Sequence, residues 1–211
     1  MRGDDEAETR PEDRAEKKKR SILEVARAHF MQHGYADSGM EAIARESGVS
    51  TATLYNLFPS KRRLFEAVIE ESGEVFSRRI LETSSAGTDD MERLRLFARG
   101  YANFLCEPFV RSVFYLVLAE RRRFRTTARG FYVMGRESYG GTLLEILTTL
   151  QASGRLNAPR LATATGQLMG MIEHPCFVVP MLSGGEVEPQ RSPDKIADDA
   201  LETFMARFGV G

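Results

Sequence analysis

The chain contains 211 residues, of which 42% are hydrophobic, and its 29 basic and 30 acidic residues give a formal net charge of −1. This length allows one large domain or two small ones, and the apolar content is enough for a sizeable core. No run approaches the roughly 20 apolar residues that a membrane span needs, and the acidic N-terminus lacks the charged and apolar regions of a signal peptide. We therefore expect a cytoplasmic protein without a membrane partner.

Strand-like alternation of apolar and polar residues is scarce, so the sequence predicts an all-α fold. Residues 1–15 are polar, acidic and nearly free of large apolar side chains, which predicts a disordered tail. Residues 16–33 predict a first helix with Ile22, Ala26 and Phe30 on its inner stripe, and Gly34 is placed to end it.

Two short helices are predicted next, across a tight turn. Ser38 and Glu41 form an S-x-x-E capping box ahead of an apolar i, i+3, i+4 pattern, so one helix should begin near residue 38 and run to Ser47. Gly48 can take the left-handed conformation that ends a helix, and Ser50 is then placed to cap the next one.

The second of these helices divides its residues between two faces. The apolar residues predicted to be buried are Val49, Leu54, Leu57 and Phe58. The residues on the opposite face are Thr51, Ala52, Tyr55 and Asn56. This outward face is short and rich in hydrogen-bonding groups, as a helix that reads base edges in the DNA major groove requires. The pattern predicts a helix-turn-helix whose recognition face is residues 51–56.

The charge distribution favours DNA binding by the same region. Residues 1–16 carry seven acidic and three basic groups, whereas residues 17–66 carry nine basic and five acidic groups. Positive charge supplies the sequence-independent part of DNA affinity through phosphate contacts. The alternative is that many surface helices are locally basic for no such reason.

Residues 22–65 resemble the N-terminal DNA-binding domain of TetR-type transcriptional regulators, in the pattern GY…M-x-x-IA…GVS…TLY…F-x-SK…LF. Thr51 and Leu57 depart from the residues common at their positions, so the resemblance does not give the operator sequence. It implies that the basic run at residues 17–20 lies near the DNA backbone, where the alternative is a solvated basic turn. It also implies a phosphate contact for Lys61, which would otherwise be unfavourable in the first turn of a helix.

The outward face and the resemblance together predict eight DNA-contacting residues. They are Ser38, Ser50, Thr51, Ala52, Thr53, Tyr55, Asn56 and Lys61. Among them, Ser38, Tyr55 and Lys61 are expected to hold phosphates. Thr51, Ala52 and Asn56 are expected to face bases.

Apolar stripes predict six further helices, nine in total. Their ranges are about 60–83, 89–106, 108–123, 126–153, 159–181 and 193–208. We expect residues 16–66 to form the helix-turn-helix domain and residues 67–211 to form a helical ligand-binding and dimerisation domain. The FYLVLAERRRF…ARGFY…GRL run resembles the AefR-like branch of TetR C-terminal domains. In that family the last two long helices pair with those of a second copy, which implies a homodimer formed by residues 159–181 and 193–208.

No pattern of catalytic or cofactor-binding residues stands out, so we expect neither an enzyme nor a bound cofactor. His174 and Cys176 offer two ligands at most, too few for a metal site, and Pro175 between them interrupts the helix. Gly135, Gly140 and Gly141 lie within a helical pattern, which predicts a kink there or a close neighbour. The free thiols of Cys106 and Cys176 are too few for a disulfide framework.

Aromatic and methionine side chains gather on the helices between residues 89 and 181. Most are expected to be core residues, but a largely apolar cavity with a few polar groups is what a small-molecule site needs. The candidate ligand residues are Tyr101, Phe104, Phe114, Tyr115, Leu118, Phe131, Met134, Tyr139 and Met169. The three tyrosines would supply its polar groups. The arginines at 121, 122, 123 and 125 are interpreted as a solvated helix end instead of an anion site.

The sequence thus predicts a homodimeric transcriptional repressor that binds a palindromic double-stranded DNA operator and is released by a largely apolar or aromatic inducer. Two alternatives stay open. One is a helical small-molecule-binding protein with weak or vestigial DNA binding, and the other is a transcriptional activator on the same fold.

Overall fold

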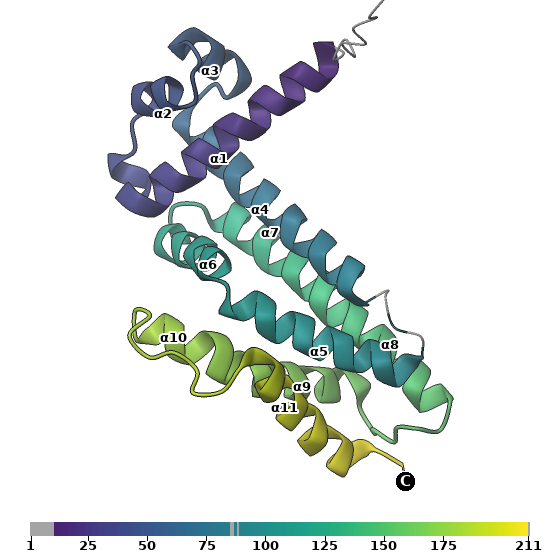
Figure 1. Cartoon of the computed structure of the whole chain (residues 1–211). Coiled ribbons are helices and arrows are strands. Elements are labelled where there is room, and N and C mark those ends of the chain that lie inside the picture. The colour runs from purple at the N-terminus through teal and green to yellow at the C-terminus, as the bar shows by residue number, and fades with distance from the viewer. Residues whose placement is uncertain (1–10, 85–86, 88, 211) are drawn as a thin grey trace, which may run out of the picture. The chain divides into compact units, whose positions relative to one another are not determined.

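A computed structural model of the chain describes residues 11–84, 87 and 89–210 (Figure 1). Every regular element in these ranges is helical, which confirms the all-α fold. The elements are α1 Pro11–Asp37, α2 Met40–Glu46, α3 Thr51–Leu57, α4 Lys61–Ser84, α5 Asp90–Cys106, α6 Pro108–Glu120, α7 Arg125–Gly135, η1 Arg136–Gly140, α8 Gly141–Ala152, α9 Leu161–Glu173, η2 His174–Val178, α10 Val179–Leu182 and α11 Pro193–Phe208. The π-helical turns η1 and η2 join their neighbours into continuous helices, so the described ranges hold the nine helices predicted.

Helix α1 begins earlier than the sequence predicted. Residues 11–15, assigned to the tail, are helical, and proline is a favoured first residue of a helix. The remainder of the predicted tail, residues 1–10, lies outside the described residues.

The chain divides into two compact units, Met1–Ile69 and Glu70–Gly211, so the boundary falls within α4. In the first unit the predicted inner stripe of α1 is confirmed, since Ile22, Ala26 and Phe30 are fully buried. Gly34, with φ 72°, interrupts α1 where the sequence predicted its end. The ring of Phe30 lies 5.3 Å from that of Phe65 on α4, which ties the two helices together.

The turn between α2 and α3 forms as predicted, but the start of α2 does not. Gly48 takes the left-handed conformation, with φ 66°, and the Ser50 side chain caps α3. The predicted capping box is wrong, because no side chain caps α2 at Gly39. Ser38 instead donates its hydroxyl hydrogen to the Gly34 carbonyl at 2.7 Å and is only 2% exposed.

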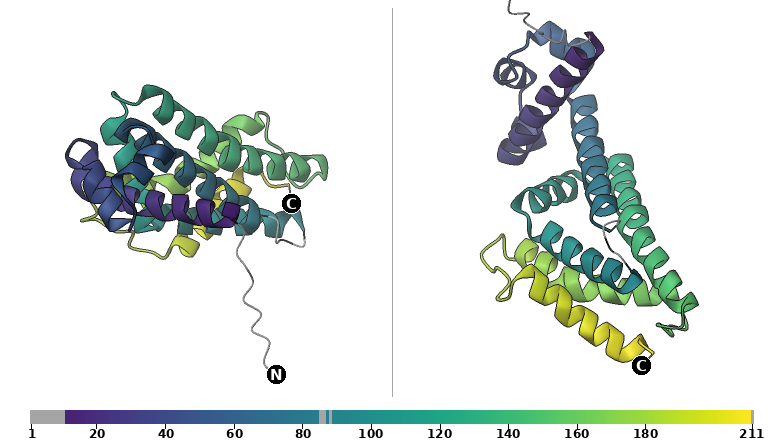
Figure 2. Two further views of the ribbon diagram at one scale, coloured as in Figure 1. Left: turned by 90° about the horizontal axis from the view of Figure 1, so that it is seen from above. Right: turned by 45° about the vertical axis from the view of Figure 1, so that its right-hand side comes forward.

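The second unit is organised around α5. This helix contacts α6, α8, α9 and α11, and Figures 1 and 2 show it between the α7–η1–α8 rod and the pair formed by α9 and α11. A bidentate ion pair between Arg99 and Asp198, with N···O distances of 2.9 and 2.7 Å, fixes α5 against α11. Within the described residues no single helix is both long and apolar enough to cross a membrane. Helices α5 and α6 pass that test only as a pair, bent by 67°.

A π-helical turn, and not a close neighbour, explains the glycines of the long rod. A Cβ added at Gly135 or Gly141 would meet nothing within 4 Å, and one at Gly140 would meet only the Arg136 side chain at 4.0 Å. Such π-turns insert one extra residue into a helix and recur at functional sites. In η2, Pro175 lacks an N–H and cannot bond to the carbonyl four residues earlier, so a wider turn accommodates it.

Candidate DNA-binding surface and ligand cavity

The outer face of α3 is exposed, as predicted. Thr51, Ala52 and Asn56 are exposed, and Tyr55 is 42% exposed. Leu54 is the buried residue of this seven-residue helix, with no exposed surface, so it anchors α3 to the unit. The helix therefore presents a short polar face whose contact with DNA stays a prediction.

Leu57 was predicted to be buried, and this is wrong. It is 39% exposed, whereas Phe58 is 5% exposed. Phe58 leaves the helical conformation, with φ −132° and ψ 94°, and packs into the core directly after the end of α3. Since Phe58 occupies the inward position, Leu57 is left beside Tyr55 and Asn56 on the exposed side.

Two predicted DNA contacts, Ser50 and Thr53, hydrogen-bond with each other. The Thr53 amide donates to the Ser50 hydroxyl oxygen at 3.1 Å, and the two hydroxyls lie 2.9 Å apart. These bonds satisfy an amide that the first turn of a helix leaves unpaired. The pair therefore shapes the N-terminus of α3, from which Thr51 and Ala52 project.

Lys61 and Ser38 have structural contacts that the sequence did not predict. The Lys61 ammonium donates to the carbonyls of Ala36 and Ser38, each at 2.8 Å, and lies 4.8 Å from the centre of the Tyr35 ring. It thereby ties the chain between α1 and α2 to α4. The Ser38 hydroxyl is buried and bonded to the Gly34 carbonyl, so its side chain is withdrawn from the predicted phosphate contact.

Replacing Lys61 by methionine is expected to lower the stability of the first unit by about 1 kcal/mol, because two carbonyls lose a charged donor. Urea unfolding followed by circular dichroism measures the change. Lys18→Met, at an exposed site on α1, is the matched control and should change stability by less than about 0.5 kcal/mol. Equal stabilities for the two variants would show that the Lys61 bonds contribute nothing.

Six of the other basic residues in the first unit fall into two sets. Residues 17–20, in the N-terminal half of α1, are all exposed. Arg62 and Arg63 instead pair with Glu66, at 3.0 and 2.5 Å. The run at 17–20 is therefore the better candidate for phosphate contacts.

The second unit contains a cavity of about 490 Å³, within the range of small-molecule sites. Its lining residues are Gly73, Phe76, Ser77, Tyr101, Phe104, Leu105, Phe114, Val117, Leu118, Arg121, Ala128, Phe131, Tyr132, Gly135, Arg136, Tyr139, Met169 and Glu173. Seven of the nine candidate ligand residues are among them. The cavity is largely apolar and aromatic, as the composition of these helices predicted.

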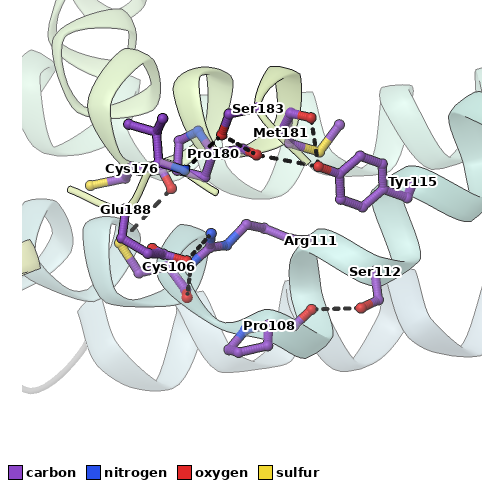
Figure 3. A network of polar contacts seen from close by, with 11 residues as sticks. Cys106, Pro108, Arg111, Ser112, Tyr115, Cys176, Pro180, Met181, Ser183 and Glu188 are labelled. Carbon is purple, nitrogen blue, oxygen red and sulfur yellow. Dashed lines mark hydrogen bonds and ion pairs between the residues drawn. The ribbon is translucent and has the colours of Figure 1, made fainter. Parts of the chain in front are cut away.

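Tyr115 does not line the cavity. Its hydroxyl donates to the Met181 carbonyl at 2.5 Å, and Figure 3 shows the ring reaching from α6 toward the backbone of α10. In the same network Arg111, 8% exposed, pairs with Glu188 at 2.9 and 3.1 Å and donates to the Cys106 carbonyl at 2.7 Å (Figure 3). These contacts hold the loop after α10 against α6.

Met134 is also absent from the lining. Its sulfur lies over the backbone of Gly73 on α4, so closely that a Cβ at Gly73 would be 2.7 Å from it. The glycine thus lets α7 approach α4. Met134 fills the space between these helices instead of facing the cavity.

The hydroxyls of the other two candidate tyrosines, Tyr139 and Tyr101, donate hydrogen bonds within the protein. The Tyr139 hydroxyl donates to the Phe76 carbonyl at 3.0 Å, and burial raises the pKa of this phenol. The Tyr101 hydroxyl donates to Glu173 Oε1 at 2.5 Å. Burial, and then the neighbouring carboxylate, raise the pKa of Tyr101 well above its ordinary value, so the phenol stays a donor.

Glu173 is a charged residue of the cavity that the sequence interpretation missed. It ends α9 and is half-buried, and it lines the cavity together with Tyr101. The signal was present, because Glu173 follows the apolar run LMGMI at the end of that helix. Arg121 and Arg136 also line the cavity, but both are exposed, in keeping with the predicted solvated helix end for Arg121.

The helices predicted to pair in a dimer leave exposed residues along one side of the α9–η2–α10 rod. They are Ala162, Gly166, Gly170, His174, Val178 and Leu182. Spacing of four residues places them on one helical stripe. Leu182, at the end of this stripe, is 85% exposed.

Two family models match the chain. Residues 22–68 match bacterial regulatory proteins of the tetR family, and residues 92–210 match the C-terminal domain of AefR-like transcriptional repressors. The transcriptional activator FasR of Mycolicibacterium smegmatis is 31% identical over 84 residues, which are 40% of this chain and 38% of that protein. The chain thus spans about two fifths of the length of this curated relative.

Solved structures match nearly the whole chain. A TetR-family transcriptional regulator from Mesorhizobium loti is 25% identical with a TM-score of 0.75, covering 93% of this chain and 99% of that one. The flavonoid-responsive regulator FrrA is 26% identical with a TM-score of 0.70, covering 92% and 98%.

Proposed function

This chain belongs to the TetR family of bacterial transcriptional regulators, and we propose on this premise that it is a cytoplasmic repressor, released from its operator by a small molecule. The observation that carries the proposal is the pairing of two features in one chain. The first unit presents the exposed polar face of α3, and the second contains a largely apolar cavity of about 490 Å³. Ligand-controlled transcription needs two parts, a DNA-binding surface and an effector site.

The DNA contacts divide by chemistry. Thr51, Ala52 and Asn56 face bases. They are exposed on α3, and their short side chains let this helix lie deep in the major groove. Tyr55 and the basic run at residues 17–20 hold phosphates, which position the helix without reading sequence. Two copies of the chain place their α3 helices in successive major grooves, roughly 34–36 Å apart, so the operator is palindromic.

The dimer forms through the α9–η2–α10 rod and α11. The exposed stripe from Ala162 to Leu182 supports this assignment, because small residues allow a second helix to approach closely and Leu182 gains a partner. Light scattering on the full chain should therefore give the mass of two copies.

Helix α4 connects the effector site to the DNA-binding unit. Gly73, Phe76 and Ser77 line the cavity, while Lys61, at the start of the same helix, bonds to the chain between α1 and α2. A ligand that fits one position of α4 better than another changes the spacing of the two α3 helices. The loss of operator affinity is limited to the ligand's preference between the two states.

Selection of bound fragments from random DNA tests the proposed function. The same selection with Asn56→Ala tests whether Asn56 reads a base. The natural chain should enrich a palindrome. Asn56→Ala should lose discrimination at one position of each half-site by about 1–3 kcal/mol, because an asparagine amide pairs with an adenine edge. An unchanged selected sequence would exclude base reading by Asn56.

Lys18→Met is the contrasting variant for this experiment. It should weaken binding to all sequences about equally and reduce the salt slope by about one. Failure of the natural chain to enrich any sequence would favour the first alternative, a small-molecule-binding protein with vestigial DNA binding. Increased transcription from the recovered site would favour the second, an activator, as FasR is named.

A further inference from the structure

The cavity combines many aromatic rings with one carboxylate. Phe76, Phe104, Phe114 and Phe131 line it, as do three tyrosines. Glu173 contributes the carboxylate, and Arg121 and Arg136 contribute basic groups that are exposed. The chemistry of the ligand therefore depends on which of these charges it meets in the cavity.

Glu173 is held in place by a hydrogen bond, but no basic residue of the described chain pairs with it. Its Oε1 accepts from the Tyr101 hydroxyl at 2.5 Å, which fixes the orientation of the carboxylate and leaves Oε2 as a further acceptor. Among the described residues no lysine, arginine or histidine forms an ion pair with Glu173. A carboxylate turned toward an apolar cavity without a counter-charge is costly once a ligand expels the water around it.

The rings beside Glu173 suit a positive charge. Tyr101 bonds to the carboxylate and packs against Tyr139, with ring centres 5.2 Å apart, and Phe104 lies 4.9 Å from Tyr139. The face of an aromatic ring attracts a cation, and the attraction strengthens when water is excluded. A neutral ligand would leave Glu173 unpaired, and an anionic ligand would be repelled by it.

We propose that the effector is an organic cation, with a ring-containing apolar body and a protonated or quaternary nitrogen that pairs with Glu173. This inference rests on the proposed function of the cavity as the effector site. Arg121 and Arg136 do not oppose it strongly, because both are exposed and water weakens the field of an exposed charge. Arg121 also donates to the Leu118 carbonyl of its own helix.

A matched series of naphthyl compounds tests the charge preference. Naphthylethylamine, naphthylethanol and naphthylacetate share a ring system and differ in charge, and calorimetric titration of the full chain at neutral pH measures their affinities. The amine should bind about 10-fold or more tightly than the alcohol, and the acetate should bind most weakly. Tightest binding by the acetate, or no binding of the amine at millimolar concentration, would overturn the proposal.

Glu173→Gln assigns the preference to one residue. Glutamine keeps the size of the side chain and an oxygen that accepts from Tyr101, so the alcohol should bind as before while the advantage of the amine disappears. Glu145→Gln, the same change at an exposed site on α8 outside the cavity, should leave that advantage intact. An advantage that persists in Glu173→Gln would exclude the ion pair.

A gel shift with the selected operator separates this inference from the proposed function. Release of DNA by the amine supports both. Tight binding of the amine by a chain that enriches no DNA sequence would retain the ligand class and refute the regulator. Release of DNA only by the acetate would retain the regulator and refute the cation.

Discussion

Replacing Ala52 by glutamate is expected to weaken operator binding by about 100-fold or more, equivalent to about 2.7 kcal/mol. Ala52 is exposed on the outer face of α3. In the proposed complex a carboxylate there would enter the groove between two phosphate backbones, and like charges brought together across an interface cost several kcal/mol. The fold should not suffer, because an acidic residue in the first turn of a helix is favourable toward its positive end.

Fluorescence anisotropy with the selected operator, at one fixed salt concentration, measures this loss. Ala119→Glu is the matched control, because it adds the same charge at an exposed alanine of α6 in the second unit. It should change affinity by less than about threefold, since it leaves α3 unchanged and salt screens exposed charges. Equal losses in the two variants would point to net charge as the cause and remove α3 from the interface.

The helix-turn-helix could be predicted from sequence because its determinants are local. Gly48 needs only its own conformational freedom to end α2, and Ser50 caps an amide three residues away. Lys61 and Ser38 could not be predicted in the same way. The carbonyls that bind the Lys61 ammonium lie 25 and 23 residues away in sequence, so they become its neighbours only in the folded unit.

In the cavity too, some residues could be predicted from the sequence and others could not. The aromatic side chains gathered on these apolar-striped helices predicted Tyr101, Phe104 and Phe131 as ligand residues, and all three line the cavity. Periodicity does not say which inward neighbour a side chain meets. Met134 therefore proved to lie against Gly73, and Tyr115 to bond to the backbone at Met181. These positions depend on how α4 and α10 pack, which no spacing within one helix encodes.

Leu54→Ala is expected to lower the free energy of unfolding of the first unit by about 2–5 kcal/mol. Leu54 has no exposed surface and is the buried residue of α3, so truncating it leaves a cavity beneath the recognition face. Isolated helices much shorter than about 12 residues are unstable in water, and α3 has seven residues. Loss of the Leu54 side chain should therefore destabilise α3, and operator affinity should fall together with the stability of the unit.

Leu57→Ala provides the matched control within the same helix. The residue type and the substitution are identical, but Leu57 is 39% exposed, so the change should cost less than about 0.5 kcal/mol. Urea unfolding of both variants, with amide hydrogen exchange of residues 51–57, measures the difference. Equal destabilisation would mean that Leu57 is packed in solution and that the exposed surface of α3 is smaller than the structure shows. Faster exchange in Leu54→Ala alone would identify Leu54 as the anchor that keeps the recognition face in position for DNA.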